Sequence, residues 1–239
     1  IISKKMIKGN ILCTICARKG SKGLKGKNYL TLLGKPLIKH TIEQANKSKL
    51  FTKIVVSSDS KKIINISKKE TDYTISRTKK LSNDHSSKVD AIKDALLRAE
   101  KHFKLRFDIV VDLDVTSPLR SKSDIKNALD LFIKKKPGNL VSGYKARRNP
   151  YFNQVMYKNS YLDVVCNSKK KIVRRQSAPQ IYDLNASIYI WNRNSLLSSI
   201  KTINKKTILF EMPYSRSIDI DDKLDFMMVK YILQKKLNK

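Results

Sequence analysis

A short loop rich in glycine and lysine holds the residue types that most clearly suit chemistry. Residues 17–28 read Ala-Arg-Lys-Gly-Ser-Lys-Gly-Leu-Lys-Gly-Lys-Asn and directly follow the apolar run at 11–16. Glycines let backbone N–H groups come close to phosphate oxygens, and the cationic side chains offset phosphate charge. The pattern predicts a loop that follows a strand and binds a triphosphate. The alternative is a solvated, lysine-rich loop without a ligand.

The glycine spacing excludes the two commonest phosphate-binding loops. In a Walker A loop a Gly-Lys-Ser/Thr end follows the first glycine after a fixed gap. Here Gly26 comes one position too late after Gly20, and Asn28 stands where the magnesium-binding hydroxyl belongs. The dinucleotide fingerprint needs Gly-x-Gly-x-x-Gly, whereas these glycines fall at 20, 23 and 26. A different class of nucleotide site is therefore indicated.

A pair of carboxylates near the end of the chain suits a metal ion. The segment 217–221 reads Ser-Ile-Asp-Ile-Asp and alternates like a strand, so that Asp219 and Asp221 would face the same way. Two carboxylates so placed can hold Mg²⁺, which prefers oxygen ligands and substrate phosphates. The alternative is that Asp221 or Asp222 caps the last helix.

Strands and amphipathic helices must position these residues, and they alternate along the chain. This is typical of an α/β fold with a mostly parallel sheet covered on both faces. In such sheets, ligands bind at the carboxyl ends of the strands. The expected strands lie near 10–16, 53–57, 73–75, 108–113, 140–144 and 187–191, and the expected helices near 36–45, 59–69, 88–102, 124–135 and 222–237.

The alternation breaks between 145 and 183. This segment is polar, aromatic and rich in arginine, with short alternating pieces such as 153–157. We expect an insertion of antiparallel strands within a single domain that spans 1–239.

Four ordered motifs resemble the signature of the cytidylyltransferases that activate nine-carbon acidic sugars, the CMP-sialic acid synthetases and their bacterial relatives. Together they cover nearly the whole chain. They are Arg18 with Ser21-Lys22-Gly23, Lys27-Asn28 and Gly34-Lys35-Pro36-Leu37; Thr116-Ser117-Pro118-Leu119-Arg120; Asn185-Ala186-Ser187-Ile188-Tyr189; and Asp219-Ile220-Asp221.

The resemblance implies a Rossmann-like three-layer nucleotidyltransferase fold with a small antiparallel dimerisation insertion, and hence a homodimer. It implies catalytic roles for Arg18, Lys22 and Asp221, and Mg²⁺ on Asp219 and Asp221. The residues that it assigns to CTP are Ala17, Arg18, Gly20, Ser21, Lys22, Lys27, Asn28, Arg77 and Ser86.

The resemblance also implies a set of sugar contacts, in which a guanidinium would bind the planar carboxylate through two parallel hydrogen bonds. Arg147 and Arg148 compete for that role and can reach a partner subunit's site. Arg120 has a structural alternative, an ion pair with Asp124 one helical turn on. The assigned residues are Asp114, Thr116, Ser117, Arg120, Arg175, Gln176 and Asn185.

Asp114 bears on which sugar is used. The common sialic acid form has glutamine there, and a carboxylate would repel a sugar acid unless it accepted a hydrogen bond from a hydroxyl or amide. An acidic pair, Asp112 and Asp114, before the Thr-Ser-Pro-Leu-Arg motif looks more like the legionaminic acid branch. Transfer of CMP from CTP to legionaminic acid is the preferred hypothesis. N-acetylneuraminate, pseudaminate or an eight-carbon keto acid sugar (KDO) are the alternatives.

Composition sets broader bounds. The chain has 239 residues, 41% of them hydrophobic, which indicates a globular fold. No apolar run approaches the ~20 residues of a membrane helix, and the first residues are too polar for a signal peptide, so we expect a cytoplasmic protein without a membrane partner. Cys13 and Cys16 lie in an apolar strand, on opposite faces, and are expected to be core residues.

The net charge of +31 raises a second class of function, binding to nucleic acid. The lysines, however, are spread over every expected helix, and no zinc finger, RNA-binding aromatic signature or heptad zipper is present. We interpret the charge as a solvated surface without a specific nucleic-acid partner.

Overall fold

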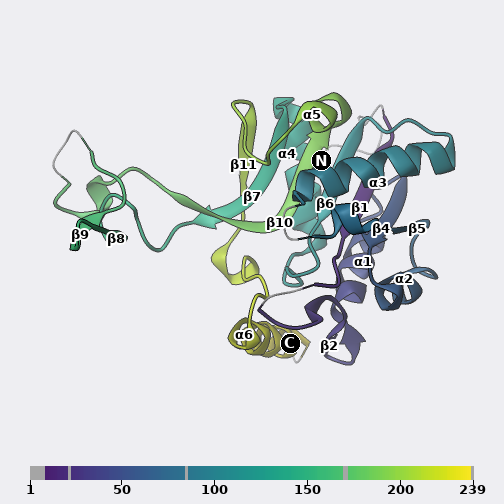
Figure 1. The fold of residues 1–239 in the computed structure, drawn as a ribbon, viewed down its shortest axis with the longest axis horizontal. Helices are drawn as coiled ribbons and strands as arrows, with labels where there is room; N and C mark the ends of the chain where they lie inside the picture. Colours follow the sequence, from purple (N-terminus) through teal and green to yellow (C-terminus); the bar gives the residue numbers. More distant parts are fainter. Residues whose placement is uncertain (1–8, 21–22, 84–85, 169–171, 238–239) are drawn as a thin grey trace.

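A seven-stranded sheet forms the centre of the molecule (Figure 1). The computed structural model describes residues 9–20, 23–83, 86–168 and 172–237, so Ser21 and Lys22 lie outside the described residues. The strand order is β11-β7-β10-β6-β1-β4-β5. The strands are β1 (Ile11–Cys16), β4 (Lys53–Ser58), β5 (Tyr73–Ser76), β6 (Ile109–Leu113), β7 (Asn139–Lys145), β10 (Tyr182–Asn192) and β11 (Thr207–Glu211).

The sheet is mostly parallel, as expected. β1 pairs in parallel with β4 and β6, β4 with β5, and β7 with β11. The exception is β10, which runs antiparallel between β6 and β7. The loops after β1, β4 and β6 therefore leave the sheet at the same edge.

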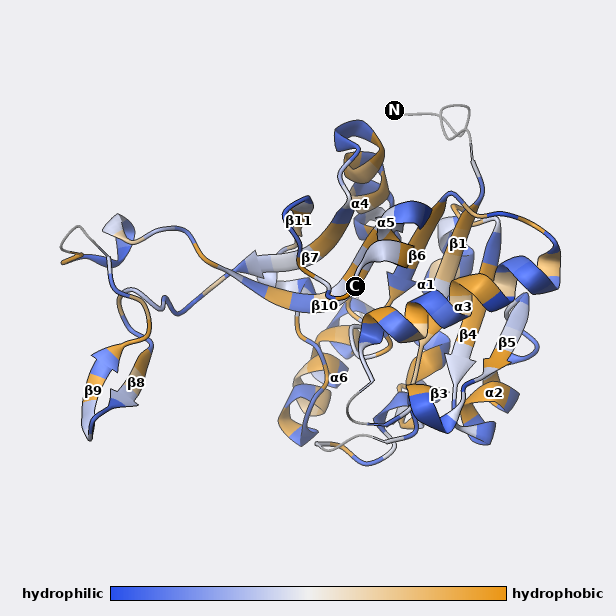
Figure 2. Ribbon diagram, turned by 45° about the horizontal axis from the view of Figure 1, so that its top comes forward, coloured by the Kyte–Doolittle hydropathy of each residue, from blue (hydrophilic) through white to orange (hydrophobic). Residues whose placement is uncertain are grey.

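Helices cover both faces and complete the three expected layers (Figure 2). One face packs against α1 (Leu37–Ser48), α2 (Lys61–Ser67) and α4 (Lys122–Lys135), and the same apolar cluster includes Val229 of α6 (Lys223–Leu237). The other face packs against α3 (Lys88–Phe103) and α5 (Arg193–Ser198). Cys13 lies in the first cluster and Cys16 packs against the second, which confirms their opposite orientation.

Serine residues fix where three of the helices begin. The side chains of Ser60, Ser87 and Ser121 each accept a hydrogen bond from a backbone N–H in the first turn of α2, α3 and α4. At α4 the contact is reciprocal, because Asp124 also bonds back to the Ser121 N–H. Such caps satisfy N–H groups that have no partner within the helix.

The region 146–181 leaves the body as an extended arm (Figure 1). It carries a two-stranded antiparallel sheet of β8 (Val155–Lys158) and β9 (Tyr161–Val164), which agrees with the insertion expected there, and the short helix η4 (Arg175–Ser177). No other strand of the described chain pairs with β8 or β9. Large apolar side chains stay exposed on the arm, among them Tyr157, Tyr161 and Leu162.

The structure differs from the sequence-based expectations at one predicted strand and adds strands that were not predicted. The segment 217–221 does not form a strand, although its alternation suggested one. The sequence analysis missed β11 and a small hairpin of β2 (Thr31–Leu32) and β3 (Lys35–Pro36), whose two strands have only two residues each. Within the described residues, no helix is both long and apolar enough to span a bilayer.

Candidate active site

A cavity of about 500 Å³ opens at the edge of the sheet where β1, β4 and β6 end. Many of the residues predicted to bind nucleotide, sugar or metal line it. These are Arg18, Gly20, Lys27, Asn28, Arg77, Ser86, Asp114, Thr116, Asp219 and Asp221. Cationic and anionic side chains thus come together from segments that are far apart in the sequence.

Close contacts explain two glycines of the first loop. A Cβ atom at Gly23 would lie 2.3 Å from the carbonyl oxygen of Asp221, so only glycine lets the loop approach the segment that carries Asp219 and Asp221. Gly26 has a φ of 68°, and a Cβ there would lie 2.4 Å from the Tyr29 ring. Among the described residues, no atom lies within 4 Å of the position that a Cβ at Gly20 would take, which leaves room for a ligand.

Two polar side chains hold the loop while leaving groups for a ligand. Asp59, which follows β4, accepts a hydrogen bond from the Lys19 N–H at 2.6 Å. Asn28 donates from Nδ2 to the Arg18 carbonyl at 2.9 Å, while its buried Oδ1 has no hydrogen-bond partner among the described residues. An unsatisfied buried acceptor that lines a cavity is suited to a ligand hydroxyl.

Arg77 is largely buried at the wall of the cavity. Its Nε and one terminal nitrogen donate to the hydroxyl and carbonyl oxygens of Ser57, at 3.2 and 2.8 Å. Ser57, near the end of β4, therefore holds the Arg77 guanidinium in place.

Asp219 and Asp221 both line the cavity, although their segment is irregular. Burial, followed by the charge of Asp221, raises the pKa of Asp219 to about 6. Lys27 contacts Asp221 Oδ1 at 2.6 Å and donates to the Ile220 carbonyl at 2.8 Å. Two neighbouring carboxylates whose mutual repulsion raises a pKa offer the oxygen ligands and negative charge that Mg²⁺ requires.

The irregular segment is anchored on both sides. Its Ile220 N–H donates to the Thr116 carbonyl at 2.8 Å. Arg216 forms two hydrogen bonds with Asp124, at 2.8 and 2.7 Å, which tie the segment to the start of α4. These contacts keep the two carboxylates beside the loop that follows β6.

A buried charge cluster lies at the floor of the cavity. The Lys88 ammonium contacts Asp114 Oδ2 at 2.6 Å and Asp112 Oδ2 at 3.1 Å, and lies 4.4 Å from the centre of the Tyr189 ring. Burial, the largest single influence, would raise the pKa of Asp114, but the charge and hydrogen bond of Lys88 and the two hydrogen bonds from Thr116 together outweigh burial and lower that pKa to about 2. Asp114 is therefore ionised, as the sequence analysis assumed for its effect on the sugar.

Four residues predicted to touch ligands lie beneath the wall of the cavity, and their direct roles need correction. The Ala17 side chain belongs to the core, and its N–H bonds the Ser57 carbonyl. Ser117 donates to the Asn185 carbonyl, and Asn185 bonds Ser142 and Ser217. The side chains of Ala17, Ser117 and Asn185 therefore support the cavity wall from the interior of the protein and do not line the cavity.

Arg120 is the fourth of these residues, and burial lowers its pKa to about 10. Its guanidinium donates to the Ser187 carbonyl at 2.6 Å and to Gln44 at 2.9 Å. The alternative ion pair with Asp124 is also wrong, because Asp124 pairs with Arg216 instead. Arg120 is a structural residue that joins β10 to α1.

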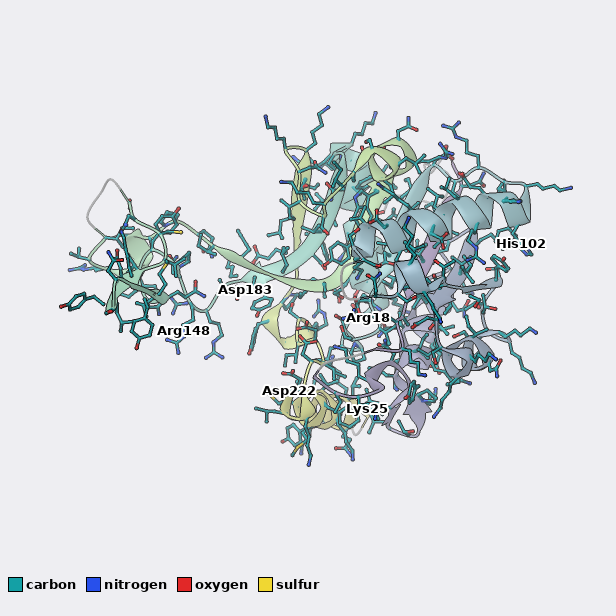
Figure 3. The ribbon with its side chains drawn as sticks, in the orientation of Figure 1. Arg18, Lys25, His102, Arg148, Asp183 and Asp222 are labelled. Carbon is teal, nitrogen blue, oxygen red and sulfur yellow. The ribbon has the colours of Figure 1, made fainter. Side chains whose placement is uncertain are left out.

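The predicted sugar contacts Arg175 and Gln176 lie in η4 on the arm, and neither lines the cavity of the same chain. Arg148 also lies on the arm, and Figure 3 shows it far from Arg18. The resemblance assigned Arg175 and Gln176 to the sugar, but the arm places them outside the cavity of the same chain.

Several residues line the cavity although the sequence analysis gave them no contact with a ligand, among them Lys88 and Ala186. Lys88 opens α3, where a cation opposes the helix dipole, and this unfavourable placement was an available signal. Ala186 has a φ of 50° at the irregularity of β10, so its backbone turns toward the cavity. Only the structure reveals that turn.

The fold and the site define a nucleotidyltransferase, and comparison with known proteins agrees. The sequence model of the cytidylyltransferase family matches residues 12–233. The chain therefore belongs to the cytidylyltransferase family.

Individual relatives are also similar over almost their whole length. The CMP-N,N'-diacetyllegionaminic acid synthase of Campylobacter jejuni is 44% identical, with 95% of this chain and 96% of the relative covered. The post-translational flagellin modification protein B of Campylobacter coli is 42% identical over the same shares. A CMP:2-keto-3-deoxy-manno-octonic acid synthetase in complex with CTP shares the fold, with a TM-score of 0.68, 17% identity and coverage of 95% and 99%.

Proposed function

We propose that the protein transfers CMP from CTP to the anomeric hydroxyl of a nine-carbon 2-keto acid sugar and releases pyrophosphate, with legionaminic acid as the preferred substrate. One observation carries the proposal. A glycine loop with the cations Arg18 and Lys27 faces the carboxylates Asp219 and Asp221 across one cavity. The similarity to the C. jejuni legionaminic acid synthase supports this choice of sugar.

The nucleotide would lie along the first loop. Arg18 and Lys27 would neutralise the phosphates, and Gly20 leaves space for them. The free Oδ1 of Asn28 would accept a hydrogen bond from a ribose hydroxyl. Arg77 and Ser86 line the same cavity, where Arg77 would contact the base or a phosphate and Ser86 the nucleotide. Positioning and electrostatics supply most of the catalysis in phosphoryl-type transfers, so no covalent nucleophile is required.

Asp219 and Asp221 would hold Mg²⁺. When bound, the ion would offset phosphate charge and lower the pKa of the attacking hydroxyl. Lys27 now neutralises Asp221 at 2.6 Å, and the same ammonium lies where it can turn to the phosphates.

The arm would complete the site in a homodimer. Tyr157 and Tyr161 are 77% and 80% exposed, and an isolated two-stranded sheet is marginally stable without a covering layer. A second copy of this chain would cover that surface. Arg175 of the partner subunit would then be available to bind the sugar carboxylate, a role that no arm arginine fills within one chain.

The high charge motivates one candidate of another class, a basic nucleic-acid-binding protein. We place the protein in the cytoplasm, where CTP is made, and interpret its lysines as a solvated surface.

Pyrophosphate release tests the proposal. The purified protein is incubated with CTP, Mg²⁺ and each of N,N'-diacetyllegionaminate, N-acetylneuraminate, pseudaminate and KDO. We expect release with the first of these at the highest kcat/KM, and none in Asp221→Ala, whose exposed side chain can be removed without disturbing the core. The control is the neighbouring exposed Asp222→Asn, which removes a charge but keeps a side-chain oxygen for the Asp225 N–H at the start of α6, and it should stay active.

Absence of release with every sugar would overturn the enzymatic proposal. Binding of duplex DNA or RNA at physiological salt, without binding of CTP and Mg²⁺, would favour the nucleic-acid alternative.

A further inference from the structure

Lys88 occupies a position that helix energetics disfavour. It is the first residue of α3, directly after the capping Ser87, where the positive end of the helix dipole repels a cation. Yet its ammonium turns into the cavity and contacts two carboxylates of the β6 end, Asp114 at 2.6 Å and Asp112 at 3.1 Å. A favourable interaction with these carboxylates offsets the unfavourable placement.

The hydrogen bonds of this cluster are unevenly used. Asp114 Oδ1 already accepts two hydrogen bonds from Thr116, both at 3.0 Å. Its Oδ2 accepts one, from Lys88, and an ionised carboxylate oxygen can accept a second. The Lys88 ammonium contacts Asp114 and, at 3.1 Å, also Asp112 Oδ2, so these two carboxylates take at most two of its three N–H donors and leave one for a ligand. The Lys88–Asp114 pair therefore presents an acceptor and a donor side by side at the floor of the cavity.

The charge of the cluster decides which ligand group it suits. Asp114 Oδ2 is an ionised carboxylate oxygen at the cavity, so a phosphate or a sugar carboxylate placed against it is repelled, and the nearby Arg18 and Lys27 attract such groups instead. A neutral polar group of a ligand can bind between Asp114 and Lys88. The N–H and C=O of a trans secondary amide point in opposite directions, whereas a hydroxyl donates and accepts at one oxygen.

We propose that Lys88 and Asp114 form a specificity-determining pair that recognises one hydroxyl of the sugar. That hydroxyl donates to Asp114 Oδ2 and accepts from the Lys88 ammonium, and Lys88 also acts as the positioning residue that fixes the Asp114 carboxylate. The inference rests on the proposed transfer of CMP to a sugar acid. It assigns to Lys88 a role separate from nucleotide binding.

Steady-state kinetics of Lys88→Met test this role, since methionine keeps the length and removes the charge. We expect the KM for the sugar to rise at least about tenfold, while kcat and the KM for CTP change less than about threefold. A set of single-deoxy sugar analogues locates the hydroxyl. One analogue should lose at least about tenfold in kcat/KM with the wild type and much less with the variant.

A double-mutant cycle separates recognition from folding. Asp114→Asn alone should raise the KM for the sugar, and adding it to Lys88→Met should raise the KM little further, because the two residues act on the same hydroxyl. Asp114→Asn also serves if Lys88→Met fails to fold, since it leaves the lysine in place. Equal losses for every deoxy analogue in wild type and variant would overturn the inference.

The outcomes are distinguishable from failure of the proposed function. If the wild type releases no pyrophosphate with any sugar acid, the proposed function itself fails. If the wild type is active and Lys88→Met retains the wild-type KM for the sugar, the proposed function stands and the role of Lys88 is refuted. A variant that loses CTP binding as well, by calorimetry, indicates a structural role and refutes it too.

Discussion

Replacing Arg216 by methionine should loosen the segment that carries the carboxylates of Asp219 and Asp221. Arg216 bonds Asp124 through two nitrogens, at 2.8 and 2.7 Å, and their side chains are 31% and 4% exposed. Burial alone would raise the pKa of Asp124, but the hydrogen bonds from Arg216 and Ser121 outweigh burial and lower it. The carboxylate is thus charged and nearly buried when its partner is removed.

The expected loss follows from the geometry. Breaking a fully buried ion pair from one side costs about 3–5 kcal/mol. Solvent around Arg216 screens part of the interaction, and Ser121 keeps two hydrogen bonds to Asp124, so we expect about 2 kcal/mol. For a chain of this size that corresponds to a fall in Tm of about 4–8 °C.

Thermal and urea unfolding followed by circular dichroism measure this loss at neutral pH. The matched control is Lys126→Met, which breaks the exposed pair between Lys126 and Asp130 on α4 and should cost about 0.5 kcal/mol or less. Equal losses for the two variants would refute the reasoning.

The pH dependence gives a second check. Because the folded pKa of Asp124 is depressed, the pair's contribution is complete above the unfolded pKa of about 3.9 and is lost as pH falls through the folded pKa. The difference between wild type and Arg216→Met should therefore shrink in acid. A difference that grows in acid would contradict the assigned charge of Asp124.

Three further predictions concern the loop, the metal and the arm. Gly23→Ala should lower turnover at least tenfold and stability by about 1–3 kcal/mol, because its Cβ would lie 2.3 Å from the Asp221 carbonyl; normal kinetics would contradict the contact. If Asp219 holds Mg²⁺, protons compete with the ion for this carboxylate, because the pKa of Asp219 is about 6. Calorimetry should therefore show weaker Mg²⁺ binding at pH 5.5 than at pH 7.5. An unchanged affinity would exclude Asp219 as a ligand of the ion. Tyr157→Asp with Tyr161→Asp should give a monomer by analytical ultracentrifugation and weaken sugar binding; an intact dimer would place the interface elsewhere.

Much of the fold was predictable because its buried strands are apolar runs. β1, β4 and β6 carry side chains that pack on both faces, and the helices between them carry one apolar stripe. The alternation of apolar and polar residues led to a wrong prediction of a strand at 217–221. There the alternation reflects Ile220, which packs into the core, between two carboxylates that line the cavity, and no neighbouring strand pairs with the segment.

The site was predictable where residues follow strands directly, as Arg18 and Asp114 do, because parallel strands end at one edge. Sequence could not separate Thr116, which lines the cavity, from Arg120, which lies beneath it. Both are polar residues of one motif, and the irregular turn of β10 provides the carbonyl of Ser187 that binds Arg120. The contact of Lys88 with the cavity could not be predicted from the sequence, because the direction of its side chain is set by the tertiary structure.

The length of β10 makes the arm and the cavity one mechanical unit. This single strand begins beside Lys145 at the base of the arm, passes Ala186 at the cavity wall, and ends against β6. Grafting the arm of another cytidylyltransferase must therefore conserve the pairing of Tyr182 with Lys145. Changing the strand by one residue between Tyr182 and Leu184 would reverse which side chains of that stretch face each side of the sheet, whereas junctions within the arm beyond the Tyr182–Lys145 pair leave the register unchanged.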